Sequence, residues 1–437
     1  MQSVVFNMKT FLIIWFGQLV SMLGSALTQF AIGVYVYQTT GSATQLSFVI
    51  LVATLPRLII APFAGALVDR WDRRAVMIVS DTVAAITTLA LWMLLAMGDL
   101  QVWHIALVVA VGAIAGIFQF PAYQAATTLL VAKEHFGRAS GLNQLAGAIA
   151  QIASPLLAGF LIVTIQMQGI ILIDFATFLF AMITLVFIRI PCPIATEEGR
   201  AARGSLWREA GYGLTYLRAR PGLLGLLIIF AFVNFALGYT GVLMTPLVLS
   251  FASADVLGSI LSFGGIGTLI GSLAMSAWGG SKQKINSLLG SIFLFSVFLI
   301  GMGARADAIV IAISAFGLFA LLPIANASSQ AIWQAKVAPD LQGRVFAIRA
   351  MIAQAITPIT YLTAGPLADF IFEPLMKSEN ALGGMIGIGA GRGIGLMFIL
   401  IGVFIAIATA IGYSISRIRN VETELPDFDV ALSGGTK

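Results

Sequence analysis

The chain has very few of the residues that build disulfides, metal sites and charged soluble surfaces. It contains one cysteine, Cys192, and two histidines, His104 and His135, among 437 residues. A single cysteine excludes an internal disulfide and a cysteine-rich metal site. Charged residues make up only 10% of the chain, against about 25% in an average soluble domain. The composition therefore excludes an ordinary soluble protein, and we expect neither a metal nor a cofactor.

Long apolar runs fill the sequence instead. The chain is 59% hydrophobic, and its mean hydropathy is +0.98. About 20 apolar residues cross a bilayer as a helix, so we predict an all-α integral membrane protein with twelve transmembrane helices. The predicted spans are residues 10–38, 44–67, 75–97, 102–131, 138–163, 168–190, 221–250, 255–279, 284–303, 307–335, 343–371 and 393–417. The first is too long for a signal-peptide core, so we interpret it as a span.

The 24 lysines and arginines are sorted by side of the membrane. With the N-terminus inside, the inner loops and the tail hold 20 of them, the outer loops hold Arg305, Lys377 and Arg392, and Arg57 lies within a span. Basic residues stay in cytoplasmic loops because their translocation is costly. We therefore predict a multi-pass protein of the cell (inner or plasma) membrane with both termini in the cytoplasm. The same sorting accounts for the net charge of +5, so no nucleic-acid partner is expected.

An internal repeat divides the chain into two halves. An offset of 206 residues aligns identical residues at three separate places: Gly65 with Gly271 and Leu67 with Leu273; Gln124-Ala125 with Gln330-Ala331 and Gly137-Arg138 with Gly343-Arg344; and Ala158-Gly159 with Ala364-Gly365. Duplicated membrane halves with a binding site between them are typical of secondary transporters. We predict an N-terminal six-helix bundle at 1–190, a cytoplasmic linker at 191–220, a C-terminal bundle at 221–417 and a cytoplasmic tail at 418–437 that is solvated from Asn420 onward.

One loop carries a family resemblance. Residues 65–74 after the second span read Gly-Ala-Leu-Val-Asp-Arg-Trp-Asp-Arg-Arg. The loop resembles the signature of the major facilitator superfamily, G-x-L-x-D-R-x-x-R-[KR], in residues, spacing and place. The opening Trp15-Phe16-Gly17-Gln18 and the turn Thr40-Gly41-Ser42-Ala43 are similar to the branch that contains macrolide efflux proteins and the enterobactin exporter. The resemblance implies two pseudo-symmetric six-helix bundles.

The same loop is a candidate gate. The resemblance implies that Asp69 faces the start of the eleventh span, and the arginines can bind carboxylates or helix C-termini across the cytoplasmic mouth. An alternative is that the arginines only anchor the topology. The candidate gate residues are Gly65, Asp69, Arg70, Arg73, Arg74, Arg138, Gly343 and Arg344.

Ionisable residues at membrane depth are functional candidates, because burying them in a bilayer is costly. Arg57 lies eight residues before Gly65, and Asp81 lies seven after Arg74. At the rise of an α-helix both lie roughly 10–12 Å into the membrane, so we predict that they pair. The pair is either a fixed ion pair or a proton-linked switch. Asp174 in the sixth span is either an interface acid or a proton carrier.

Polar residues at helical spacing mark a candidate substrate cavity. They recur every three or four residues in spans one, four, seven and ten, the helices that line the central cavity in the family that the chain resembles. The candidates are Gln18, Ser21, Ser25, Gln29, Gln119, Tyr123, Asn234, Asn326, Gln330 and Trp333. Polar stripes also hold helices together, so any one of these residues can be a packing residue. A mostly neutral, aromatic lining suits a bulky amphipathic or uncharged substrate.

We therefore predict a secondary active exporter of hydrophobic or amphipathic small molecules that works by alternating access. Proton-coupled antiport is implied by the resemblance. The alternatives are export of an endogenous siderophore or lipid, and a membrane receptor or scaffold without translocation. The sequence contains no catalytic Ser/His/Asp set, phosphate loop or C-x-x-C, so we do not expect an enzyme. The expected partners are a small-molecule substrate, protons and the lipid bilayer. The oligomeric state is open, with a monomer as the expectation.

Overall fold

The computed structural model describes residues 8–68, 71–188, 219–338, 341–377 and 381–425. Within these residues every regular element is helical, and twelve helices are long and apolar enough to cross a membrane. This confirms the predicted all-α membrane fold. Most of the predicted linker and most of the predicted tail lie outside the described residues.

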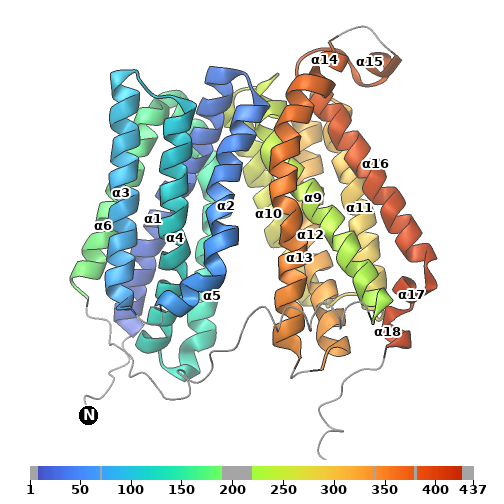
Figure 1. The fold of residues 1–437 in the computed structure, drawn as a ribbon, viewed down its shortest axis with the longest axis horizontal. Coiled ribbons are helices and arrows are strands. Elements are labelled where there is room, and N and C mark those ends of the chain that lie inside the picture. Colours follow the sequence, from blue (N-terminus) through green and yellow to red (C-terminus); the bar gives the residue numbers. More distant parts are fainter. Residues whose placement is uncertain (1–7, 69–70, 189–218, 339–340, 378–380, 426–437) are drawn as a thin grey trace, which may run out of the picture. The chain divides into compact units, whose positions relative to one another are not determined.

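Six of the spanning helices come from the first half of the chain. They are α1 (Met8–Thr40), α2 (Ala43–Val68), α3 (Arg73–Met97), α4 (Val102–Leu130), α5 (Phe136–Thr164) and α6 (Gln166–Val186), with a 3-10 turn, η1, at Lys133–His135. The helices of this half run side by side (Figure 1).

The second half contributes the other six. They are α9 (Pro221–Leu249), α10 (Ala254–Trp278), α11 (Lys284–Ala304), α12 (Ala308–Lys336), α13 (Gln342–Leu367) and α16 (Arg392–Ser414). Short elements follow α13 and α16: the π-turn η2 (Ala368–Phe372), α14 (Glu373–Leu375), α15 (Ala381–Ile386), α17 (Ser416–Arg419) and α18 (Val421–Glu424). All twelve long helices begin and end within four residues of the predicted spans.

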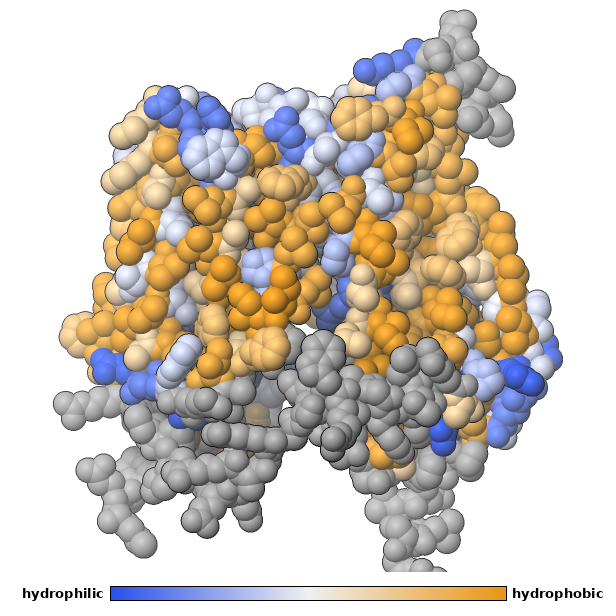
Figure 2. Space-filling model, in the orientation of Figure 1, coloured by the Kyte–Doolittle hydropathy of each residue, from blue (hydrophilic) through white to orange (hydrophobic). Residues whose placement is uncertain are grey.

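The chain forms two compact units. Unit 1 comprises residues 1–197 with 252–262, and unit 2 comprises residues 198–251 with 263–437. Helix α10 therefore has its first residues in unit 1 and the rest in unit 2. In each unit, apolar side chains cover the visible flank and hydrophilic residues gather toward the helix ends (Figure 2). Large exposed side chains such as Ile59 and Phe120, at 65% and 64% exposure, have the polarity of a lipid-facing surface.

Local sequence fixes several helix ends. Asp72 caps α3 by accepting the backbone N–H of Ala75 at 2.9 Å, and Gly98 ends the same helix in a left-handed conformation at φ 79°. His104 belongs to a capping box at the start of α4, where its ring nitrogen accepts the N–H of Gln101 at 3.1 Å. Asp307 caps α12 in the same manner as Asp72 caps α3.

Close helix packing in unit 1 depends on glycines of α1. A Cβ atom added at Gly17 would lie 2.6 Å from Thr184 Oγ1, and one at Gly24 would overlap Thr177 and lie 2.9 Å from Asp174 Oδ1. Any larger side chain at either position would force α1 and α6 apart. Gly17 and Gly24 therefore set the distance between these two helices.

The segment after α16 packs against the rest of unit 2, so the predicted solvation of the tail is wrong for Val421 and Glu422. Val421 is fully buried and Ile418 is nearly so. The Glu422 carboxylate accepts the backbone N–H groups of Lys284 and Ile285 at 3.0 and 2.8 Å, and so caps the N-terminus of α11. Lys336 Nζ at the end of α12 donates to the carbonyl oxygens of Glu422 and Leu425. Charge suggested solvation, but the Glu422 carboxylate satisfies N–H groups at the start of α11 that would otherwise lack partners, and the two carbonyl oxygens bind the Lys336 ammonium group.

Candidate functional site

A buried carboxyl group joins three helices of unit 1. Asp81 of α3 is 0% exposed and accepts a hydrogen bond from Gln119 Nε2 of α4. The same nitrogen lies 3.3 Å from Gln18 Oε1 of α1 and donates to it. Asp81 Oδ2 and Gln18 Nε2 are also buried and make no hydrogen bond within the described residues. An incompletely satisfied buried carboxyl group is costly, so this cluster is the first candidate for a functional site.

The predicted ion pair between Arg57 and Asp81 is not formed. Asp81 bonds to Gln119, whereas the side chain of Arg57 is exposed and has no carboxylate partner among the described residues. The prediction assumed that consecutive antiparallel helices face each other. In the structure α2 and α3 each pack against α4, which places α4 between the two residues.

Asp174 of α6 lies in the interface with α1. It is 2% exposed, and Ser25 Oγ donates to its Oδ1 over 3.4 Å. Asp174 also lies beside Gly24, where the two helices come closest. The alternative of an interface acid is therefore the one that the geometry favours.

The polar residues of α1 do not form one stripe toward one cavity. Gln18 faces α4, whereas Ser25 faces α6. Ser21 is buried, and Gln29 is exposed. The three-to-four-residue spacing predicted one face, but the stripe is wide enough to serve two helix contacts.

Tyr123 of α4 contacts a residue that the sequence analysis missed. Its hydroxyl donates to Asn143 Oδ1 of α5 at 2.8 Å. Nothing in the local sequence around Asn143 marked it as a partner of α4. The pair joins two helices that are consecutive in the chain.

In unit 2 the candidate cavity residues of α12 surround an arginine. Arg349 of α13 donates from Nη1 to Gln330 Oε1 at 2.9 Å and from Nη2 to Ser329 Oγ at 3.0 Å. Its guanidinium carbon lies 5.0 Å from the centre of the Trp333 ring. Arg349 was counted among the 20 basic residues of the inner side although the predicted span 343–371 contains it, and in the structure it lies within α13 at the start of the candidate span Ile348–Leu375.

The remaining candidates of unit 2 form no such cluster. Asn234 of α9 is partly buried and Asn326 of α12 is exposed. Neither side chain makes a hydrogen bond within the part of the chain that the structure describes. Both remain predictions as substrate contacts.

The signature loop is partly described. Arg74 Nε donates to the carbonyl oxygen of Leu185 at 2.9 Å, and Nη2 donates to that of Val186. These bonds cap the C-terminal end of α6 within the same unit, and the predicted contact across the cytoplasmic mouth stays a prediction. Asp69 and Arg70 lie outside the described residues, as do the surroundings of Gly65 and Gly343 and the side chain of Arg344. Arg73 is partly buried and Arg138 is exposed.

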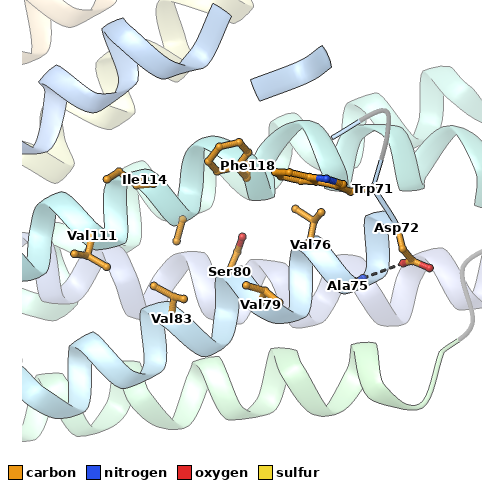
Figure 3. A pocket seen from close by; sticks show the side chains of 11 residues that line it. Trp71, Asp72, Ala75, Val76, Val79, Ser80, Val83, Val111, Ile114 and Phe118 are labelled. Atoms are coloured by element: carbon orange, nitrogen blue, oxygen red, sulfur yellow. Dashed lines mark hydrogen bonds between the residues drawn. The ribbon is translucent and has the colours of Figure 1, made fainter. Parts of the chain in front are cut away.

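An apolar groove of about 650 Å³ runs between α3 and α4 (Figure 3). Trp71 and Phe118 meet at one end with ring centres 5.8 Å apart, close to the capping residue Asp72. Valines and Ile114 line the rest, and Val79 is 60% exposed. No candidate cavity residue lines this groove, so it is distinct from the predicted substrate site.

Comparison with known proteins identifies a matching family and several similar proteins. The family model described as Major Facilitator Superfamily matches residues 14–360. Macrolide efflux protein A of Streptococcus pyogenes is 30% identical over 368 residues, which cover 83% of this chain and 90% of that protein. The multidrug efflux pump Tap of Mycolicibacterium fortuitum is 24% identical over 369 residues, covering 82% and 89% of the two chains.

A solved structure has the same fold. It is a bacterial homolog of the human lysosomal transporter Spinster in an inward-facing, unoccupied conformation. The TM-score is 0.72 at 13% identity, over 96% of this chain and 98% of the other. At this identity the likeness concerns the fold alone.

Proposed function

Because the chain belongs to the Major Facilitator Superfamily, we propose that it exports hydrophobic or amphipathic small molecules. It is a multi-pass membrane transporter rather than an enzyme. Export proceeds by alternating access and is driven by proton antiport. The protein lies in the cell membrane with both termini in the cytoplasm, as the distribution of basic residues favours.

Similarity to two efflux proteins supports the direction of transport. Macrolide efflux protein A and the pump Tap are both named for efflux, and both align with more than four-fifths of this chain. The family match at 14–360 includes the helix positions of Gln18, Asp81 and Gln119. A mostly neutral polar stripe within apolar helices fits an apolar or amphipathic substrate.

The observation that carries proton coupling is the cluster of Asp81, Gln119 and Gln18. An ionised carboxylate only accepts hydrogen bonds, so it holds the Gln119 amide with its NH₂ group toward Asp81. A protonated carboxyl group can donate, and the Gln119 carbonyl can then turn toward it. Proton binding to Asp81 thus changes the orientation of an amide that also contacts α1. This links protonation to two helices of the candidate cavity.

The gate proposal extends the contacts of the signature loop. Arg74 binds the end of α6, and Asp72 caps the start of α3. The part of the loop that leads into α3 is therefore held in place within unit 1. We assign the gate to Gly65, Asp69, Arg70, Arg73, Arg74 and Arg138 with Gly343 and Arg344. In this assignment Asp69 holds the start of α13 when the cytoplasmic side is closed.

The test uses purified protein in proteoliposomes with an imposed pH gradient and a panel of fluorescent dyes and macrolides. Asp81→Asn is the informative variant, because the carbonyl of the substituted amide can still accept from Gln119 while the titratable group is gone. The expected result is loss of gradient-driven accumulation with retained exchange of substrate between the two sides. Asp307→Asn is the matched control, because asparagine caps α12 as well as aspartate does.

The outcomes separate the two parts of the proposal. Wild-type protein that moves no member of the panel contradicts export of amphipathic molecules. Wild-type protein that exports them without regard to the pH gradient contradicts antiport. If Asp81→Asn keeps full gradient dependence, Asp174→Asn decides whether the interface acid carries the proton instead.

A further inference from the structure

We infer that Arg349 and its neighbours in unit 2 bind the anionic head group, a carboxylate or phosphate, of an amphipathic molecule. The inference rests on the proposed function and narrows the class of molecule that the transporter recognises. It departs from the prediction of a mostly neutral cavity lining. Its basis is a cation at the start of the candidate membrane span Ile348–Leu375 with only neutral partners among the described residues.

The position of Arg349 makes its charge costly. It lies seven residues after the start of α13, roughly 10 Å along the helix axis, where the apolar candidate span Ile348–Leu375 begins. Arginine near a helix end can extend to the membrane surface. Here it turns to the protein instead, because its acceptor Ser329 is 1% exposed and the ring of Trp333 beside it is equally buried.

The partners of Arg349 are neutral, so none of them balances its positive charge. The guanidinium donates to an amide and a hydroxyl oxygen, and it lies over the rings of Trp333 and Phe230, 5.0 and 5.9 Å from their centres. No carboxylate contacts it among the described residues. The residue is only partly buried, and its planar fork bonds to neutral oxygens alone. Such a fork matches a carboxylate or phosphate with two parallel hydrogen bonds.

The internal repeat shows that the positive charge is not needed to join the helices. The offset of 206 residues that relates the two halves places Tyr123 at Ser329 and Asn143 at Arg349. Both pairs are hydrogen-bonded, both span 20 residues, and each joins the corresponding helices of its unit. In unit 1 a neutral pair makes this contact. The cation is therefore a separate property of unit 2.

The surroundings fit the rest of an amphipathic molecule. Phe230, which is partly buried, offers an aromatic face next to the cation, and Gln330 offers an amide, while the buried ring of Trp333 packs against the guanidinium from within the protein. An acid head on an apolar body is the chemistry shared by a transported amphiphile and by an anionic phospholipid. This chemistry is closer to the siderophore-or-lipid alternative than to an uncharged drug.

The experiment measures binding of a matched pair of probes to full-length protein in phosphatidylcholine nanodiscs. The pair is a fluorescent fatty acid and its methyl ester, which share one apolar body and differ in charge. Wild type is expected to bind the acid at least tenfold more tightly than the ester, as measured by fluorescence anisotropy. The double variant Ser329→Tyr/Arg349→Asn copies the neutral pair of unit 1 and is expected to bind both probes alike.

Two further variants keep the test decisive. Arg349→Gln removes the charge with one substitution and serves if the double variant does not fold. Arg305→Gln removes an exposed arginine of unit 2 that belongs to no assigned site and is expected to leave the acid-to-ester ratio unchanged. If the ratio in wild type is near one, or if it survives in both Arg349 variants, the inference is overturned.

A second arm identifies the source of the anion. Native mass spectrometry counts phosphatidylglycerol retained from mixed nanodiscs, and proteoliposome transport follows the acid probe. Loss of acid transport in the Arg349 variants assigns the head group to the substrate. Loss of retained phosphatidylglycerol alone assigns it to a resident lipid. Both results support the anion site, and neither depends on a pH gradient, so failure of proton coupling is distinguishable from failure of this site.

Discussion

Glu422 offers a direct test of how the segment after α16 stabilises unit 2. Its carboxylate accepts two backbone N–H groups at the start of α11, at 3.0 and 2.8 Å. Losing a side-chain cap costs about 0.5–2 kcal/mol, and losing a negative charge at a helix N-terminus costs about 0.3–1 kcal/mol. Glu422→Ala should therefore lower the free energy of unfolding by about 2 kcal/mol.

The measurement is thermal unfolding of the purified protein followed by tryptophan fluorescence. For a unit of this size, about 2 kcal/mol corresponds to a decrease in Tm of roughly 4–8 °C. Glu422→Gln is expected to lose about half as much, because its single carbonyl oxygen can accept one of the two N–H groups. Glu424→Ala is the matched control, since Glu424 lies two residues after Glu422, carries the same charge and has an exposed side chain. Equal Tm values for Glu422→Ala and Glu424→Ala would refute the capping role.

Three other substitutions test helix contacts in unit 1. Arg74→Ala removes the hydrogen bonds to the end of α6 and should cost about 1–3 kcal/mol in thermal unfolding, whereas Arg138→Ala at an exposed site should have no measurable effect. Gly24→Ala should reduce the yield of monodisperse protein because a Cβ there overlaps Thr177, whereas Gly33→Ala, with its nearest atom 4.0 Å away, should match wild type; equal yields contradict the close approach. Asp72→Ala should destabilise α3 by about 1 kcal/mol and Asp72→Asn should not, so identical unfolding curves of the two variants count against the cap.

The spans could be predicted from the sequence because the bilayer imposes a simple rule. A membrane helix must satisfy its backbone internally and present apolar side chains over about 20 residues. That rule acts locally, so residue counts alone located both ends of α4 and α9 within one residue. The cap at Asp72 is also local, because Asp72 accepts the backbone N–H of Ala75, three residues further along the chain.

Helix neighbours could not be predicted in the same way. The expected pair of Arg57 and Asp81 required α2 and α3 to face each other, and the packing around α4 is not encoded in either helix by itself. The stripe on α1 had the same ambiguity, since Gln18 and Ser25 are seven residues apart and yet contact different helices. Periodicity shows which residues share a side of a helix, but not which partner lies there.

Two contacts were missed although the sequence contains a signal for one of them. The offset of 206 residues was available, and applying it to Tyr123 and Asn143 gives Ser329 and Arg349. Arg349 was hidden because its charge was counted as a topology signal. Glu422 carried no such signal, because an acidic residue after the last span has the composition of a solvated tail.

The contact between Glu422 and α11 also has a temporal consequence. The acceptor lies 138 residues after Lys284, whose N–H group it binds. At a synthesis rate of about 5–20 residues per second, α11 leaves the ribosome roughly 7–28 s before Glu422 does. During that interval the inserted helix has two exposed donors, which water or a chaperone must satisfy. Unit 2 thus completes this contact late in synthesis. A slow codon or a fused reporter near residue 422 should lengthen the period in which quality control can remove the unfinished protein.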